Sequence, residues 1–216
     1  MSSEIHNTRE IEPKYLIKSE VPNIHIVDAK IEDVRKEIGK KYFDTVGQKM
    51  QAKSTPIREA VILLPDNDND KNLENIFSLN EELKMKYGIE AFQIHIHNDE
   101  GHITLDAEKK YNYHAHVVYN WTDSKTGKSL KLGKDDLSEI QTLTANHLKM
   151  ERGEKGSKSL SLNHHQYRGY LQIKDEFVKE FKIELTEKKD RELRTKIIEN
   201  DREDKNNRRN KGGISR

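Results

Sequence analysis

Apolar residues recur at the spacing of an α-helix in four segments of the chain. Residues 29–43 carry one apolar stripe among charged positions, and residues 71–87 and 134–151 repeat this pattern. Gly88 directly follows the second of these segments, where a glycine often ends a helix. Residues 163–206 are highly charged and have apolar positions mainly in their first half. We therefore predict three amphipathic helices and one long C-terminal helix that packs only over its first half.

Three other segments have the pattern of β-strands. Residues 58–65 are a short apolar run rich in β-branched side chains, which indicates a buried strand. Residues 90–97 and 112–121 contain alternating positions, and in the second of them apolar and aromatic residues alternate with His114 and His116. One face of the predicted sheet is therefore apolar and the other carries histidines. The polar loop between these two strands is expected to form a small hairpin of its own.

The remaining segments complete a prediction of the fold. Residues 1–28 have weak periodicity, and two prolines break them into short pieces. A Lys-Thr-Gly-Lys turn near residue 126 predicts a hairpin that returns to a short strand at 128–132. Strands that cluster in sequence and are linked by hairpins indicate the α+β class, with an antiparallel sheet flanked by helices. We predict one domain over residues 1–160, followed at 161–216 by the long charged helix and a basic tail.

Composition limits the kinds of protein that fit. Hydrophobic residues make up 32% of the chain and charged residues 36%, which favours one modest core with solvated helices. No apolar run approaches a membrane span and the N-terminus has no signal-peptide pattern, so a cytoplasmic protein with no membrane partner is expected. Residues 188–216 hold eleven Lys and Arg against six Asp and Glu. This tail either binds phosphates or is simply a solvated helix end.

Histidines concentrate in the two alternating strands. Five of the ten histidines lie in residues 91–121, and His95 with His97, like His114 with His116, are two residues apart. In a strand such pairs point to one face, so neighbouring strands would bring three or four imidazoles together. The chain has no cysteine, so a metal here takes nitrogen and oxygen ligands. Zinc fits such a site, and Mn²⁺ or Mg²⁺ fits better if a phosphodiester substrate adds oxygens of its own.

Three ordered motifs resemble those of a known enzyme family. His6-Asn7-Thr8-Arg9 is similar to an HNxR motif, and His97-Asn98-Asp99-Glu100 followed by His114-Ala115-His116 is similar to an HxDE…HxH motif. A later Met150-Glu151-Arg152-Gly153 is similar to the Glu-Arg-Gly that follows these motifs. Together they resemble the HUH endonucleases, and more narrowly the Mob/Pre plasmid mobilisation relaxases, over about residues 5–155.

The resemblance implies a bacterial relaxase that nicks one strand of transfer-origin DNA and remains covalently attached to it. It assigns His97, His114 and His116 as ligands of a divalent metal and His6 as the nucleophile. Glu100 would orient or deprotonate His6 or support the metal ligands, and Arg9 would hold a phosphate. Single-stranded DNA is the expected substrate, and other mobilisation or transfer proteins are expected partners.

Several alternatives stay open at this stage. The loop between HxDE and HxH is longer than is usual in the family, so His95 and His102 are further candidate ligands. Tyr167 and Tyr170 are rival nucleophiles, although their spacing also fits core packing. The family has a strand ahead of HNxR, so this chain is expected to lack it or to belong to a longer protein. A DNA-binding or replication-accessory protein with a structural metal, and a zinc hydrolase, are the other functions considered.

Overall fold

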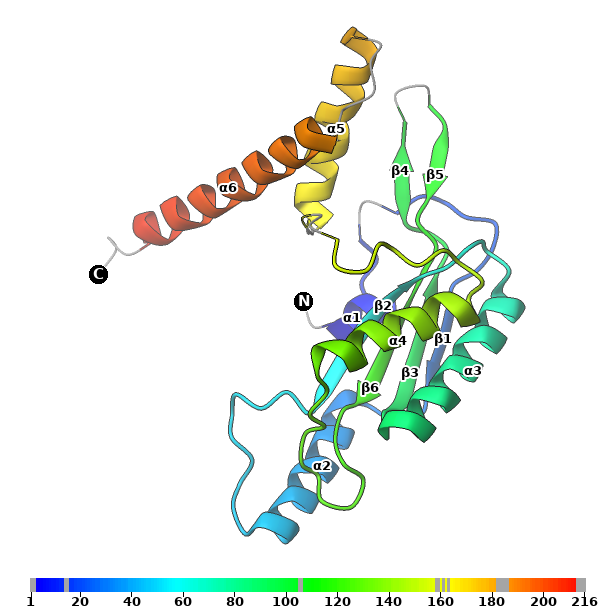
Figure 1. Ribbon diagram of the computed structural model, residues 1–216, viewed down its shortest axis with the longest axis vertical. Helices are drawn as coiled ribbons and strands as arrows, with labels where there is room; N and C mark the ends of the chain where they lie inside the picture. The colour runs from blue at the N-terminus through cyan, green and yellow to red at the C-terminus, as the bar shows by residue number, and fades with distance from the viewer. Residues whose placement is uncertain are drawn as a thin grey trace. The chain divides into compact units, whose positions relative to one another are not determined.

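The chain forms two compact units in the computed structural model, Met1–Gly153 and Glu154–Arg216 (Figure 1). The structure describes residues 3–13, 16–104, 107–157, 160, 162, 164–181 and 187–212.

The first unit is built on a four-stranded antiparallel sheet. Its strands are β1 (Ile24–Val27), β2 (Ile57–Leu63), β3 (Glu90–His97) and β6 (His114–Asn120), in the order β1-β3-β6-β2. The two histidine strands are therefore direct neighbours at the centre of the sheet, as the antiparallel α+β prediction requires. The loop between them forms the expected hairpin, whose strands are β4 (Gly101–Ile103) and β5 (Lys109–Tyr111).

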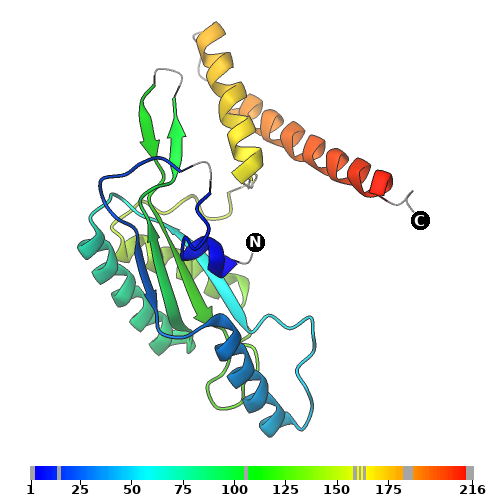
Figure 2. The same ribbon diagram turned by 180° about the vertical axis from the view of Figure 1, so that it is seen from behind.

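The two faces of this sheet have different covers. Helices α3 (Asn69–Tyr87) and α4 (Lys134–His147) pack on one face, which we call the helix face (Figure 1). The short helix α1 (Ser3–Asn7) lies on the opposite face, which we call the histidine face (Figure 2). Helix α2 (Ile31–Val46) follows β1. The core lies between the sheet and the two helices of the helix face and includes Ile62, Ile76, Leu79, Ile94, Ile96, Ala115 and Val117.

Helix ends follow local sequence. The Asp68 side chain accepts a hydrogen bond from the backbone N–H of Lys71 and caps the start of α3. Gly88 ends the same helix with a φ of 71°, a left-handed conformation that glycine adopts at little cost, as predicted.

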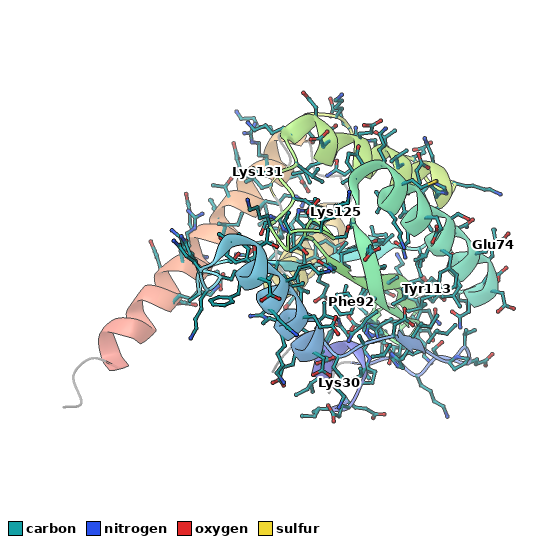
Figure 3. The ribbon with its side chains drawn as sticks, turned by 90° about the horizontal axis from the view of Figure 1, so that it is seen from below. Lys30, Glu74, Phe92, Tyr113, Lys125 and Lys131 are labelled. Atoms are coloured by element: carbon teal, nitrogen blue, oxygen red, sulfur yellow. The ribbon has the colours of Figure 1, made fainter. Side chains whose placement is uncertain are left out.

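Three predictions in this unit need correction. The strand predicted to be buried at 58–65 is the edge strand β2, in which Val61 and Leu63 are exposed because only one neighbouring strand covers them. Strand β1 lies within residues 1–28, where no strand was predicted, because its four residues are too few for a clear alternation. The strand predicted at 128–132 is absent, and Thr122 and Ser129 make only an isolated bridge. The turn before it forms, but it packs on α2 instead. A Cβ at Gly127 would lie 2.9 Å from the backbone nitrogen of Tyr42 (Figure 3, near Lys125).

The second unit contradicts the prediction of one long helix. Its two helices are α5 (His164–Phe181) and α6 (Glu187–Gly212). Tyr170 of α5 is buried, its hydroxyl donates to the Asp190 carboxylate of α6, and the Arg194 guanidinium lies 4.5 Å from its ring centre. The second helix thus covers part of the apolar stripe of the first, which a single straight helix would leave in water. In the described residues, no helix has the length and apolar character that crossing a membrane demands.

Candidate metal centre

The strand register gathers histidines from three strands on the histidine face. His97 is opposite His114 and His95 is opposite His116 across β3 and β6, while His25 of β1 is opposite His95. Because directly opposite residues in an antiparallel pair share a face, all five imidazoles lie on one side of the sheet. The four histidines of β3 and β6 are buried there, which is unusual for polar side chains and calls for specific partners.

Three of these rings form a closed triangle. The ring centres of His97 and His114 are 5.2 Å apart, those of His97 and His116 are 4.9 Å apart, and those of His114 and His116 are 5.0 Å apart. The structure thus brings together the three histidines that the resemblance assigns as metal ligands.

The two nitrogens of the His97 ring differ: one is hydrogen-bonded to the backbone and the other offers a lone pair. Its Nε2 lies 2.9 Å from the backbone carbonyl oxygen of Asn7 in α1. A carbonyl oxygen can only accept, so Nε2 carries the hydrogen and Nδ1 of the neutral ring has a lone pair. This Nδ1 is buried and has no hydrogen-bond partner among the described residues. An orphaned buried acceptor of this kind is costly unless a ligand fills the position.

His114 and His116 are tied in the same way. Nδ1 of His114 donates to the backbone carbonyl of Asn112 at 2.6 Å, and Nδ1 of His116 donates to the carboxylate of Glu59 in β2. In the neutral form of each ring, Nε2 keeps its lone pair. Metal-binding histidines commonly donate their second nitrogen to a carbonyl or carboxylate in this manner, which fixes the ring and the tautomer.

His6 and Glu100 complete the cluster. The ring centre of His6 is 5.6 Å from that of His97 and 5.4 Å from that of His116, and its Nε2 lies 3.5 Å from Glu100 Oε1. Glu100 Oε1 also lies 3.8 Å from Nδ1 of His97. In the described part of the chain, two sets could hold a metal ion with donor atoms within 4.8 Å of one another: His6, His97 and His116, or His97, Glu100 and His114.

Arg9 is placed differently from its predicted role. Its guanidinium donates to both oxygens of Asp99, at 2.7 and 3.3 Å, and to Glu100 Oε1 at 2.8 Å, and only 8% of the side chain is exposed. The fourth donor reaches the carbonyl of His6 at 3.2 Å. With its donors used in this way, Arg9 holds Glu100 and the end of α1 in place, and a phosphate clamp is not the role that this geometry favours. The residue has a φ of 58°, which turns the chain sharply after α1.

His95 is engaged on both nitrogens. The amide nitrogen of Gln93 donates to Glu4 and to the carbonyl of Ala29, so its oxygen accepts from His95 Nε2 at 3.3 Å. His95 Nδ1 then accepts from Nδ1 of His25 at 3.1 Å. No lone pair of His95 is left for a metal. His102, the other extra candidate, lies in β4 and belongs to neither of the two sets.

Burial favours the neutral form of four of these histidines by lowering their pKa values. Loss of hydration lowers the pKa of His97 to about 2 and that of His95 to about 4. The same cause lowers the pKa of His6 and of His114, although Glu100 acts in the opposite direction on both. Neutral imidazoles have the lone pairs that metal binding and nucleophilic attack both require.

Sequence reasoning missed some of the supporting residues. Glu59 was not identified, although a lone carboxylate in the apolar run 58–65 was a usable signal. The His25 strand was also missed, and the carbonyls of Asn7 and Asn112 carry no sequence signal because any residue has one. Tyr167 and Tyr170 lie in the second unit, where Tyr170 is buried and stacks on Tyr167.

Comparison of the chain with models of known protein families, with curated proteins and with solved structures gives no match. Its chemistry is therefore inferred from the geometry of the site.

Proposed function

We propose that the protein is a metal-dependent DNA-nicking enzyme, a relaxase of the HUH type, that cuts one strand by transesterification and keeps one end covalently bound. The observation that carries the proposal is the set of free imidazole nitrogens at the centre of the sheet. His97, His114 and His116 each donate one nitrogen to a protein oxygen and leave the other as a lone pair, with His6 and Glu100 beside them. A structural histidine cluster needs no such common pattern.

The residues present fit a divalent ion. Nδ1 of His97 is a buried acceptor without a partner among the described residues, and His114, His116 and Glu100 supply nitrogen and oxygen donors around it. Three neutral imidazoles leave coordination positions for substrate oxygens, which favours Mn²⁺ or Mg²⁺, with zinc as the alternative. When bound, such an ion would withdraw charge from the scissile phosphate.

His6 is the proposed nucleophile. Its Nε2 lies 3.5 Å from Glu100 Oε1, so in the proposed step Nε2 carries the hydrogen and the lone pair is on Nδ1. Nδ1 attacks phosphorus, the bond from phosphorus to the 3′ oxygen breaks, and that oxygen leaves with the electron pair and takes a proton from water. The ring becomes positively charged, and Glu100 neutralises it by accepting the Nε2 proton. The 5′ end of the strand then remains on His6 as a phosphoramidate.

Arg9 and Asp99 position this pair. Arg9 binds the same oxygen of Glu100 that faces His6, and it also donates to the His6 carbonyl. Asp99 accepts from Arg9 and, at 2.6 Å, from Asn23 ahead of β1. Hydrogen bonds thus hold Glu100, the base, and His6, the nucleophile, in position. This lowers the free-energy cost of orienting them for reaction.

The test is the formation of a covalent protein–DNA adduct. The protein would be incubated with circular single-stranded DNA and with supercoiled plasmids that carry candidate transfer origins, in Mn²⁺ and in chelator, and denatured before electrophoresis. We expect metal-dependent nicking and a DNA-linked protein band. His6→Ala should remove that band and Tyr167→Phe should retain it. A phosphoramidate is cleaved by acid, whereas a tyrosine phosphodiester survives it, so acid treatment identifies the attacking atom.

The matched control is His102→Ala, which removes a histidine close in sequence but outside the two donor sets. It should leave the adduct intact. If no DNA or metal gives nicking or an adduct while the protein still binds DNA, the relaxase proposal fails and a DNA-binding protein with a structural metal takes its place.

A further inference from the structure

A groove runs along the β2 edge of the sheet. It has a volume of about 710 Å³ and lies within the first unit, between β2 and α4. Its apolar lining comes from the sheet side through Ile62 and Trp121 and from the helix side through Leu137, Ile140 and Leu148. The size and the mostly apolar lining are those of a binding site.

Helix α4 leaves its apolar stripe only partly covered. Leu137, Ile140, Thr144 and Leu148 follow one another at helical spacing and all line the groove. None of the residues of α4 itself is fully buried, and Leu137 is 42% exposed. The stripe packs on the core at Ile140 and Leu148, but its Leu137 end faces an open channel.

Beside the channel, the outer edge of β2 has backbone groups that no strand of the described residues pairs with. Leu64 donates to the carbonyl of Tyr113 and Trp121 donates to that of Pro56, which sets the alternation of hydrogen bonds between β2 and β6. Since every second residue of an antiparallel strand bonds to its neighbour, Ile57, Val61 and Leu63 direct their N–H and C=O groups outward. In the described residues, β2 is the last strand of the sheet on this side.

The side chains of this edge are also exposed. Val61 is 62% exposed and Leu63 is 55% exposed, both on the histidine face, where His116 and His114 lie opposite them on one side only. β2 has no proline, lysine or bulge, and its charged residues, Arg58 and Glu59, lie in its first half, away from Val61 and Leu63.

Two buried donors lie at the same groove. The indole N–H of Trp121 and Nε of Arg152 are buried and have no hydrogen-bond partner among the described residues. Trp121 is only 8% exposed, and the Arg58 guanidinium lies 4.7 Å from its ring centre. Both groups are hydrogen-bond donors, so a ligand that satisfies them has to offer hydrogen-bond acceptors.

We propose that the groove binds an extended polypeptide segment, supplied from outside residues 1–216, that adds a fifth strand beside β2. Its backbone would pair with Ile57, Val61 and Leu63, and its carbonyls would supply acceptors near Trp121 and Arg152. Alternate side chains would be aliphatic and fill the channel under α4, and those between them would cover Val61 and Leu63. An apolar helix or a small molecule would fill the channel but leave the strand edge unpaired.

Trp121 is the only tryptophan of the chain, so its fluorescence reports directly on the groove. Nine-residue peptides would be selected from a phage-displayed library in which every second position is Val, Ile or Leu, against a library with Ser or Thr at those positions. We expect enrichment only from the aliphatic library, and a saturable change in Trp121 fluorescence when the selected peptides are added to the full chain.

Two pairs of variants test the binding mode. Val61→Pro removes an outward N–H that makes no bond to β6 and should weaken binding by at least about tenfold, whereas Val61→Thr keeps the N–H and should bind normally. Ala145→Phe should obstruct the channel and Ala145→Ser should not, which keeps the test valid if the proline variant does not fold. Hydrogen exchange should slow at the amides of Val61 and Leu63 on binding.

Equal enrichment from both libraries would overturn the proposal. So would peptide binding that is retained in both Val61→Pro and Ala145→Phe. So would a dimer of the chain, seen by sedimentation and lost in Val61→Pro, because a second copy would then occupy the edge.

Discussion

The two faces of one sheet show how the same strands serve different purposes. Ile96 and His97 are consecutive in β3 and both are completely buried. Ile96 points into the apolar core under α3 and α4, whereas His97 points at α1 and is bonded through a single nitrogen to the Asn7 carbonyl. The helix face thus gains its stability from apolar area. The histidine face buries polar rings that need partners, and one of its acceptors has none among the described residues.

The difference between the two faces means that residues important for folding stability and residues important for metal binding alternate along the strands. A side chain removed from the helix face leaves a cavity, while one removed from the histidine face removes a donor atom. Adjacent residues in β3 and β6 should therefore give opposite results in stability and in metal-binding measurements, and the following changes test that contrast.

Ile96→Ala should have the largest effect on folding. It deletes buried methylene and methyl groups in the centre of the core, and we expect it to lower the free energy of unfolding by about 2–5 kcal/mol. Urea denaturation followed by circular dichroism measures the change. Metal affinity of the folded fraction should stay within about twofold, and a loss of metal binding at native temperature would contradict the separation of the faces.

His97→Ala should reverse this pattern. It removes the central candidate ligand, which belongs to both donor sets, so we expect Mn²⁺ affinity and nicking to fall by at least about 100-fold, or about 3 kcal/mol. Isothermal titration calorimetry and the adduct assay give the two values. Unfolding of the metal-free protein should change by less than the Ile96→Ala value, and equal destabilisation by both variants would count against a functional cluster.

Acid should weaken the metal-free protein in part through the buried histidines of the histidine face. The pKa of His95 is about 4 in the folded protein and near 6.5 in the unfolded chain, so the unfolded state binds the extra proton between these values. This stability is complete above pH 6.5 and is lost as the pH falls, by about 3 kcal/mol at pH 4 for this residue. His95→Gln should flatten the urea midpoint plotted against pH in this window, while a core variant such as Val117→Ala should shift the curve without changing its slope.

Glu59→Gln should produce a smaller loss. The amide can still accept from His116 Nδ1, but it lacks the charge that makes the ring a stronger donor to a metal. We expect metal affinity to fall by about 10- to 100-fold with little effect on folding, as measured by competition with a fluorescent chelator. Arg58→Gln, at the next position and on the other face, is the control and should keep the wild-type affinity.

Tyr167→Phe should have the smallest effect. Tyr167 is 46% exposed, so loss of its hydroxyl should change stability by no more than about 0.5 kcal/mol and leave the adduct yield unchanged. Loss of the adduct in this variant, with retention in His6→Ala, would transfer the nucleophile to the second unit.

The sequence predicted the parts of this protein that follow from period and spacing. Alternation in β3 and β6 indicated both the shared face of the histidine pairs and the apolar opposite face, because register in a half-buried sheet is set by that pattern. Strand β1 could not be found because four residues carry too little pattern, and the presence of two helices, α5 and α6, could not be found because both have charged helical sequence.

The finer structure of the site was beyond prediction for a different reason. That Arg9 faces Asp99 and Glu100 depends on where α1 meets the sheet, some ninety residues away in sequence. Likewise, the second nitrogens of His97 and His114 find backbone carbonyls, and these are set by the path of the chain and not by residue type.

The hydrogen bonds that hold the imidazoles bear on whether the protein folds before or after it binds a metal ion. His97, His114 and His116 are each anchored to a protein oxygen before any ion arrives, and the apolar core on the other face is complete without one. Unlike a zinc finger, which is unfolded until metal binds, this fold is expected to form first and load afterwards. Its cofactor would then be exchangeable, so that treatment with a chelator leaves an intact protein that a fresh ion restores within one binding step, with no refolding.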